Sequence, residues 1–445
     1  MAKWITRKDF MKMLGAAGIG YFVGNMVDDL AEKANETSQP AKPDKDSRGF
    51  IHAKEDFGVS GNGLFDDTAK LQAAFNEAAQ SGLMLYVPKG TYKHTSPLFA
   101  DGNDFRMFGD GTQTVFKPTY SNADAIVIGN RSNTSMRGSG SKPSGWAKDF
   151  AVIGPAPKPN TKSTGIKLNG MRQFRVENTY VSNFDIGYDL INNCFGSSFH
   201  NIRALWAGLN VGVNLRTGLQ SGNDIQFYNA WLGGEIAAVH ISGDGGGYQF
   251  WGGQFGNAEK AANSKVPDDQ RGVVILGKDY HTNKLGGVAN VTVEGVDIEN
   301  FKYGWAFRAF YEVDLSLRGL GVYANDTKNF PRGFLKMDNA GASNISMLRV
   351  PVKGKYAGSR LIEVNGQQSG FCINEIECKY AVTLGGKMQN GGSMLVQSRI
   401  QQGQAMYRDD GTSKLLLDNV MLRPRGGRLE LSADWGKTWK EIATK

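Results

Sequence analysis

The residues best suited to chemistry in this chain are acidic side chains near position 297. Asp297 and Glu299 stand two residues apart, and Glu294 precedes Asp297 by three. On a β-strand, residues i and i+2 share one face, with backbones roughly 6.5–7 Å apart. Paired carboxylates cleave glycosidic bonds, because one protonates the leaving oxygen while the other activates water or attacks carbon. The spacing suits an inverting pair, with carboxyls ~6.5–9.5 Å apart, but side-chain direction leaves the stereochemistry open.

Repeated segments supply the strands that position these carboxylates. Each repeat spans sixteen residues between its first and last apolar anchors, and the first three begin 25 and 26 residues apart. A coil with an insertion, at about 256–290, precedes the fourth. Recurrence every 20–30 residues indicates a solenoid of stacked coils. The four segments are Phe174 to Leu190, Phe199 to Leu215, Ile225 to Ile241 and Val291 to Phe307.

Alternation along each segment separates inward from outward positions. The sixth position after the first anchor is expected to face outward and holds Tyr180, Leu205, Trp231 and Asp297. Trp231, Tyr180 and Tyr228, which we place below Glu294, are therefore candidate substrate-binding residues, because sugar rings stack on exposed aromatic faces. Two alternatives remain: the carboxylates are only solvated surface charges, and Trp231 packs against the insertion.

Glu235 is a further catalytic candidate, because it occupies a position that is apolar in the other segments, which hold Phe184, Leu209 and Phe301. A partly buried carboxylate there would have a raised pKa, which suits a general acid. The alternative is that Gly233 and Gly234 bend the chain and turn Glu235 outward. Asp224, which precedes a strand, fits either a site or a turn.

Residues 56–92 combine a glycine-rich turn, a helix and a strand. Asp67 and Thr68 form a candidate N-cap, an alanine-rich helix with Leu71 and Phe75 on one face follows, and a strand ends at Pro88. This order resembles the start of pectate-lyase-like right-handed β-helix proteins, in which the helix caps the first coil. The resemblance covers about 40 residues. It implies membership of a family of secreted polysaccharide lyases and hydrolases and of phage tailspike depolymerases.

Composition excludes several classes of protein. Glycine makes up 58 of 445 residues, nearly twice the usual ~7%, which fits many strands joined by tight turns. The net charge of +8 is spread along the chain without basic runs, so it favours an acidic polysaccharide over nucleic acid as partner. Three cysteines and five scattered histidines show no metal-binding spacing, so we expect no metal and no cofactor. No apolar stretch reaches the ~18 residues of a membrane span.

The first 48 residues decide location rather than chemistry. Residues 4–33 read as a helix, followed by a polar linker. Residues 6–12 resemble a twin-arginine export motif, although Lys8 stands where the second arginine belongs and no Ala-x-Ala cleavage site follows. The alternative is a retained helix that docks or trimerises the protein, with Phe10, Leu14, Ala17 and Tyr21 at coiled-coil spacing.

The sequence therefore predicts an all-β protein, a single-stranded right-handed parallel β-helix with an N-terminal helix cap and a small C-terminal β-hairpin. We divide it into a helix and linker (1–48), the cap and first coils (49–120), the β-helix body (121–425) and a hairpin (426–445). The hairpin carries the Asp-box pattern Ser-x-Asp-x-Gly-x-Thr-Trp at residues 432–439, which we interpret as structural.

The function we expect is that of a phage tailspike-like depolymerase that cleaves a bacterial surface or capsular polysaccharide. As such it would be a homotrimer on the virion tail, with residues 1–48 contacting tail proteins and no stable membrane insertion. One alternative is a secreted bacterial lyase or hydrolase; for a lyase, Lys302, Arg308 and His281 are candidate bases. The other is a glycan-binding adhesin or tail structural protein without catalysis.

Overall fold

The chain divides into two compact units, Met1–Arg48 and Gly49–Lys445, and the computed structural model describes the second. The described residues are 49–101, 104–129, 145–155, 162–192, 194–204, 209–216, 223–243, 245–257, 267–301, 303–324, 331–339, 343–353, 362–364, 368–377, 382–384, 388–397, 405–407, 415–417, 420–425, 428–432, 438 and 440–441. Several sequence predictions lie outside them: both readings of residues 1–48, the outward residue Leu205, and the candidate base Lys302.

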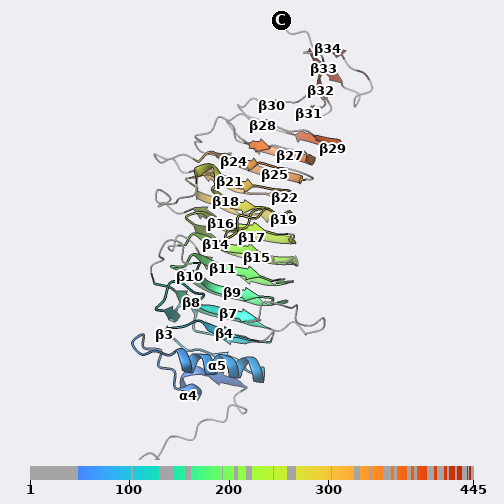
Figure 1. Cartoon of the computed structure of the whole chain (residues 1–445). Helices are drawn as coiled ribbons and strands as arrows, with labels where there is room; N and C mark the ends of the chain where they lie inside the picture. The colour runs from blue at the N-terminus through green and yellow to red at the C-terminus, as the bar shows by residue number, and fades with distance from the viewer. Residues whose placement is uncertain are drawn as a thin grey trace, which may run out of the picture. The chain divides into compact units, whose positions relative to one another are not determined.

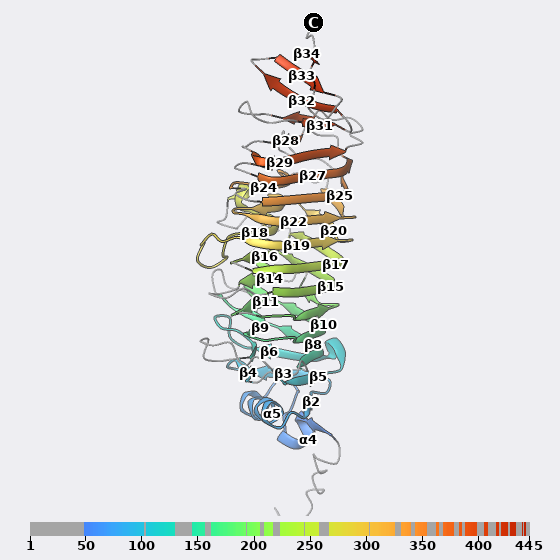
Figure 2. The ribbon, with the colours of Figure 1, turned by 90° about the vertical axis from the view of Figure 1, so that its right-hand side faces the viewer.

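The described strands form two large stacked sheets, in which neighbouring strands run parallel until the C-terminal strands (Figures 1 and 2). The first sheet has 22 described strands: β1 Phe50–His52, β2 Met84–Tyr86, β3 Gly90–His94, β5 Arg106–Phe108, β6 Thr114–Pro118, β8 Trp146–Ile153, β10 Arg175–Ser182, β12 Ser198–His200, β13 Arg203–Ala204, β15 Asn223–Gly234, β17 Gly245–Asn257, β19 Val288–Glu294, β20 Asp297–Phe301, β22 Val313–Arg318, β23 Gly321–Ala324, β25 Ser343–Lys353, β27 Gln368–Glu377, β29 Met388–Gln397, β31 Leu415–Leu417, β32 Val420–Arg425, β33 Arg428–Ser432 and β34 Lys440–Glu441.

The second sheet faces the first across the core and has ten described strands: β4 Leu98–Ala100, β7 Ile126–Gly129, β9 Thr164–Asn169, β11 Ile186–Ile191, β14 Val211–Arg216, β16 Ala237–Ser242, β18 Gly272–Leu276, β21 Trp305–Ala309, β24 Gly333–Met337 and β26 Ile362–Val364. A separate pair joins β28 Val382–Leu384 to β30 Ala405–Tyr407. The chain alternates between the two sheets as it rises, which makes the fold a right-handed parallel β-helix, as the sequence predicts.

Two helices lie at the N-terminal end of the solenoid, α4 (Ala53–Phe57) and α5 (Thr68–Ser81), as Figure 1 shows. Leu71 and Phe75 of α5 are fully buried, and the Phe75 ring lies 5.2 Å from that of Phe105. Asp67 occupies the N-cap position but makes no cap hydrogen bond. Its buried carboxylate instead accepts backbone N–H bonds from Ser60 at 2.8 Å and Gly61 at 2.9 Å. Asp67 therefore fixes the glycine-rich turn rather than the helix end.

The interior consists of columns in which each coil places a side chain directly over its equivalent in the coil below. Phe199, Phe227 and Phe250 are paired by strand register and essentially fully buried. Their rings stack, with centroids 4.7 Å and 4.6 Å apart. Burying one phenylalanine side chain contributes about 2–3 kcal/mol, so such columns account for much of the stability.

A second column runs along the bend of the first sheet, where the chain adopts left-handed backbone conformation. Asp149, Asn178, Asn201 and Asn229 all have φ between 50° and 61°. Each asparagine donates its Nδ2 to the side-chain oxygen of the residue one coil below, at 2.9, 3.1 and 2.8 Å. Asparagine tolerates this conformation better than most residues, so its side chain ties one coil to the next. Higher coils continue the column with Gly252, Gly295 and Gly319.

The register corrects the sequence alignment at two places. Phe199 pairs with Phe227, not with Ile225, so Arg203 takes the outward position expected for Leu205. A full coil, β17, also separates β15 from β19 and β20. A shift of two residues preserves the alternation of faces, which is why Trp231 and Asp297 are exposed as predicted although the coil partners differ.

The C-terminal strands leave the parallel pattern, because β31, β32, β33 and β34 pair antiparallel. Glu430 pairs with Glu441 and Leu431 with Lys440, so β33 and β34 flank the Asp-box segment. Residues 433–437 and Trp439 of that segment lie outside the described residues.

The asparagine column generates a stability prediction. Asn201 bonds to both Asn178 and Asn229, so Asn201→Gly, which keeps the left-handed backbone, should lower the free energy of unfolding by about 1 kcal/mol. Asn201→Ala should lower it by about 2 kcal/mol, because the left-handed conformation is also unfavourable for alanine. Urea denaturation of the two variants measures both terms. Equal stability of the alanine and glycine variants would contradict the role assigned to the backbone.

Candidate functional site

An outward column on the first sheet carries the predicted site. Strand register places Tyr180 beside Arg203, Arg203 beside Trp231, Trp231 beside Gln254, and Gln254 beside Asp297. Trp231 and Asp297 thus share a column as expected, and they are two coils apart because β17 lies between them. With strands ≈4.7–4.9 Å apart, their backbones are separated by about 9–10 Å.

Trp231 is the most exposed aromatic residue of this column, with 38% of its surface accessible. The Arg203 guanidinium lies over the Trp231 ring, 5.2 Å from its centroid. The Trp231 indole Nε1 donates a hydrogen bond to Asn229 Oδ1 at 3.3 Å. Gln254 follows on the other side in register. Trp231 is therefore held in one orientation, with its exposed part directed to solvent.

The two carboxylates of β20 turn toward different neighbours. Glu299, which is half-buried, accepts a hydrogen bond at its Oε2 from Gln254 Nε2, 2.7 Å away on the preceding coil. Asp297 is exposed, and its Oδ1 lies so close to Gly321 on the following coil that a Cβ there would collide with it. The side chains therefore diverge along the solenoid axis.

Glu294 belongs to a neighbouring outward column that contains an aromatic stack. The rings of His200, Tyr228 and Trp251 are parallel within 23°, with centroids 4.7 Å and 4.8 Å apart. Glu294 pairs with Trp251 in the next coil, and Arg318 follows Glu294. Both faces of Tyr228 are covered by its neighbours, so Tyr228 presents only its edge and its hydroxyl to a ligand.

Glu235 lies in the turn between β15 and β16 and belongs to a different group of side chains. Its neighbour is Tyr280, which interacts with it electrostatically and donates its hydroxyl to Asp185 Oδ1 at 2.8 Å. Tyr280 stands in a loop that packs on the second sheet, and burial raises its pKa. The structure therefore does not bring Glu235 to Asp297 and Glu299.

Two of the candidate lyase bases, Arg308 and His281, also lie away from the carboxylates. Arg308 is on β21 of the second sheet and only 2% exposed, and its guanidinium is bonded to Asp269 O, Ala309 O and Asp338. His281 stands in the loop with Tyr280, where burial and the charge of Arg216 lower its pKa. Sequence proximity was misleading here, because each coil carries the chain from one sheet to the other within a few residues.

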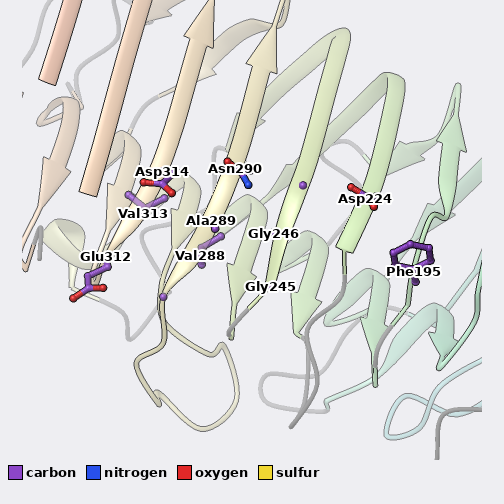
Figure 3. A pocket seen from close by; sticks show the side chains of 12 residues that line it. Phe195, Asp224, Gly245, Gly246, Val288, Ala289, Asn290, Glu312, Val313 and Asp314 are labelled. Carbon is purple, nitrogen blue, oxygen red and sulfur yellow. The ribbon is translucent and has the colours of Figure 1, made fainter. Parts of the chain in front are cut away.

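A cavity of about 660 Å³ lies near the starts of β15, β17, β19 and β22 (Figure 3). Its lining includes Asp224, Glu312 and Asp314, and the amide of Asn290. Glycines of β17 and Gly287 form part of the wall, and Phe195 closes one side with 38% of its surface exposed. None of the lining residues that the structure describes is basic.

Sequence reasoning missed Gln254 and Trp251, which both lie on β17. The signal was present, because Tyr248, Phe250 and Phe255 repeat the spacing of Ile225, Phe227 and Leu232. Glycines 245–247, 252 and 253 interrupt this coil and obscured it. Among the described residues no three acidic, histidine or cysteine side chains are grouped to hold a metal ion, and no helix is long and apolar enough to cross a membrane.

Stacked parallel coils with short bends and a helix at the first coil define a protein of the right-handed parallel β-helix class. Residues 50–297 match the family model described as rhamnogalacturonase A/epimerase, pectate lyase-like, and the chain belongs to this family. No curated protein sequence matches the chain.

Solved structures share the fold at low sequence identity. The Dettilon tailspike protein is 10% identical with a TM-score of 0.53, over 91% of this chain and 82% of that protein. The gp42 tailspike of Acinetobacter phage vb_AbaP_AS12 is also 10% identical with a TM-score of 0.53, over 89% and 82%. The ORF18 protein of Geobacillus virus E2 is 16% identical with a TM-score of 0.48, over 91% and 69%. At these identities the likeness concerns the fold.

His240, buried on the second sheet beside Tyr280, generates a pH prediction. Burial lowers the pKa of His240 to about 3, and the nearby charged and titratable groups are Asp279, Lys278 and His281. Below pH ~6.5 the unfolded chain therefore binds a proton at His240 that the folded chain does not bind. The free energy of unfolding consequently decreases as pH falls toward 3. Between pH 7 and pH 4 this difference in proton binding lowers the free energy of unfolding by about 3 kcal/mol.

We expect the variant His240→Gln to lose about 3 kcal/mol less than the parent protein between pH 7 and pH 4, measured by urea denaturation at each pH. Parallel curves for the two proteins would show that His240 is protonated in the folded state.

Proposed function

We propose that this protein is a tailspike-like depolymerase that hydrolyses glycosidic bonds in a bacterial surface or capsular polysaccharide, with Asp297 and Glu299 as its catalytic carboxylates. The observation that carries the proposal is the placement of both carboxylates on the outward face of β20, oriented apart by Gly321 and Gln254. Membership of the pectate-lyase-like family and the tailspike fold support it.

The contacts suggest a role for each carboxylate. The Gln254 amide nitrogen donates but does not accept, so the Glu299 oxygen that faces it acts as an acceptor. A carboxylate that activates water needs this form, and we assign Glu299 as the general base. Asp297, exposed and free to approach the leaving oxygen, is then the general acid. Glu294, one strand earlier, is assigned to binding sugar hydroxyls beside Trp251.

Trp231 and Tyr180 are assigned to substrate binding in the column below Asp297. Trp231 contributes its exposed part, since Arg203 lies over one face of its ring. Tyr228 contributes through its edge and hydroxyl, and Glu235 has no part in this site. We further propose that the protein acts as a homotrimer outside the cell or on the virion tail. The choice between docking and export for residues 1–48 stays a prediction.

Substitution of the carboxylates tests the assignment. Asp297→Asn and Glu299→Gln should each reduce cleavage at least 100-fold, because each removes one half of the acid–base pair. The readout is release of reducing ends from a panel of acidic and neutral bacterial polysaccharides, with ultraviolet absorbance recorded in the same sample. Glu177→Gln, an outward carboxylate on β10 of the same sheet, is the matched control and should retain activity.

Three other results would overturn the proposal. Cleavage that survives the double variant would place the chemistry elsewhere. New absorbance would indicate the unsaturated product of a lyase. Binding that depends on Trp231 without any cleavage would favour a glycan-binding adhesin.

The divergence of the two side chains predicts the stereochemistry. Asp297 faces the following coil and Glu299 the preceding one, which leaves room for a water between Glu299 and the sugar. The product should therefore have the inverted anomeric configuration. Proton NMR of the first-formed product measures it, and retention would require a covalent intermediate and refute the assignment of Glu299 as base.

A further inference from the structure

We infer that the cavity around Asp224, Glu312 and Asp314 is a distal subsite of the proposed depolymerase, and that it takes an uncharged or amino sugar and disfavours uronates. The inference rests on the proposed function for the identity of the ligand as a glycan. Its basis is the position of the cavity, the composition of its wall and the charge of the sheet face.

The cavity reaches β19, and the carboxylate pair stands on β20, the next strand of the same coil. Asn290 in the cavity and Glu294 are both on β19, and Asp297 begins the next strand of the same coil. Asn290, Glu294 and Asp297 are all exposed on the outward side of the first sheet. Asn290 lies about 13 Å from Glu294 along β19, and Asp297 follows beyond the bend at Gly295. A bound glycan that reaches both places must therefore span several sugar units.

The wall of the cavity has the elements of a sugar site. Phe195 offers an exposed apolar ring, and Asn290 offers an amide that both donates and accepts. Three carboxylates offer only acceptors, which match hydroxyl and ammonium donors. Gly287 leaves open space, because a Cβ there would meet only one atom, Glu312 O, at 4.0 Å.

Charge on this face selects against anionic sugars. The described lining of the cavity holds three carboxylates and no basic residue, and Glu294, Asp297 and Glu299 are three more outward carboxylates on β19 and β20. Among the described residues, Arg203 is in register with Asp297, which lies two coils beyond Trp231, and Arg318 pairs with Glu294. A uronate carboxylate placed here is repelled at short range, whereas an ammonium group is attracted.

The positive net charge of the chain lies elsewhere, which removes the reason for expecting an acidic polysaccharide. From residue 349 onward the sequence contains 15 lysines and arginines against nine acidic residues, a surplus of six out of the total of +8. Net charge therefore does not describe the surface that meets the glycan, and the local charge decides the substrate class.

The test measures binding in the Asp297→Asn/Glu299→Gln double variant of the full chain, so that it does not depend on cleavage. The probes are three hexasaccharides with the same β-1,4 linkage, made of glucosamine, glucose or mannuronate, titrated calorimetrically at low salt. We expect affinity to fall in that order, with about a fivefold step at each charge change. The steps should shrink in 1 M salt, where the Debye length is about 3 Å.

Three variants connect the preference to the cavity. Asp224→Asn together with Asp314→Asn should remove most of the discrimination, and asparagine suits the left-handed backbone of Asp224 (φ 57°). Gly287→Tyr should weaken all three hexasaccharides by filling the cavity, but should leave disaccharide binding unchanged. Glu77→Gln on α5 is the control and should behave like the parent.

Tightest binding of mannuronate, no binding of any hexasaccharide, or an order unaffected by the Asp224 and Asp314 substitutions would overturn the subsite. These outcomes are separate from failure of the proposed function, which the cleavage assay reports. A protein that cleaves through Asp297 and Glu299 but lacks the charge preference would keep its function and lose the distal subsite.

Discussion

Parallel register is the constraint on which this molecule depends. Each coil places its residues about 4.8 Å above their equivalents, so a side chain mainly meets the side chain at the same position one coil away. Like therefore stacks on like: phenylalanine on Phe227 in the core, asparagine on Asn201 at the bend, and an aromatic ring on Tyr228 outside. The site follows the same rule, because Gln254 reaches Glu299 only across one coil spacing.

This rule changes how exposed aromatic residues should be interpreted. A tyrosine or tryptophan on a solenoid face resembles a sugar platform in sequence, but register covers its ring with the next ring of the column. Tyr228 is covered in this way by His200 and Trp251. Trp231 differs because Arg203 and Gln254 are its column neighbours, and it keeps an accessible part. Accessibility is thus decided by the neighbouring coils rather than by the residue itself.

The sequence was informative where a local period determines the answer. Alternation correctly separated the buried Val296 and Ile298 from the outward Asp297, because these positions depend only on one strand. Alternation repeats every two residues, so it did not reveal that Phe199 pairs with Phe227. The structure aligns the left-handed residues Asn201 and Asn229, and this alignment corresponds to that pairing. Tyr280 and Asp185 form a hydrogen bond although they are 95 positions apart, and no sequence repeat relates them. The cavity arises from the stacking of four strands and has no signature in any one of them.

The exchange of asparagine for glycine along the bend has a consequence for the evolution of specificity. Gly252 and Gly319 carry no side chain, and a Cβ on either would meet nothing within 4 Å. Gly295 in the same column separates Glu294 from Asp297, so a strip of bare main chain runs between the two carboxylate columns. Glycine adopts this backbone without strain and asparagine tolerates it, which limits substitution along the strip mainly to these two residues. Adaptation to a new glycan therefore falls on the flanking side chains, while the strip between them has few side chains to choose from.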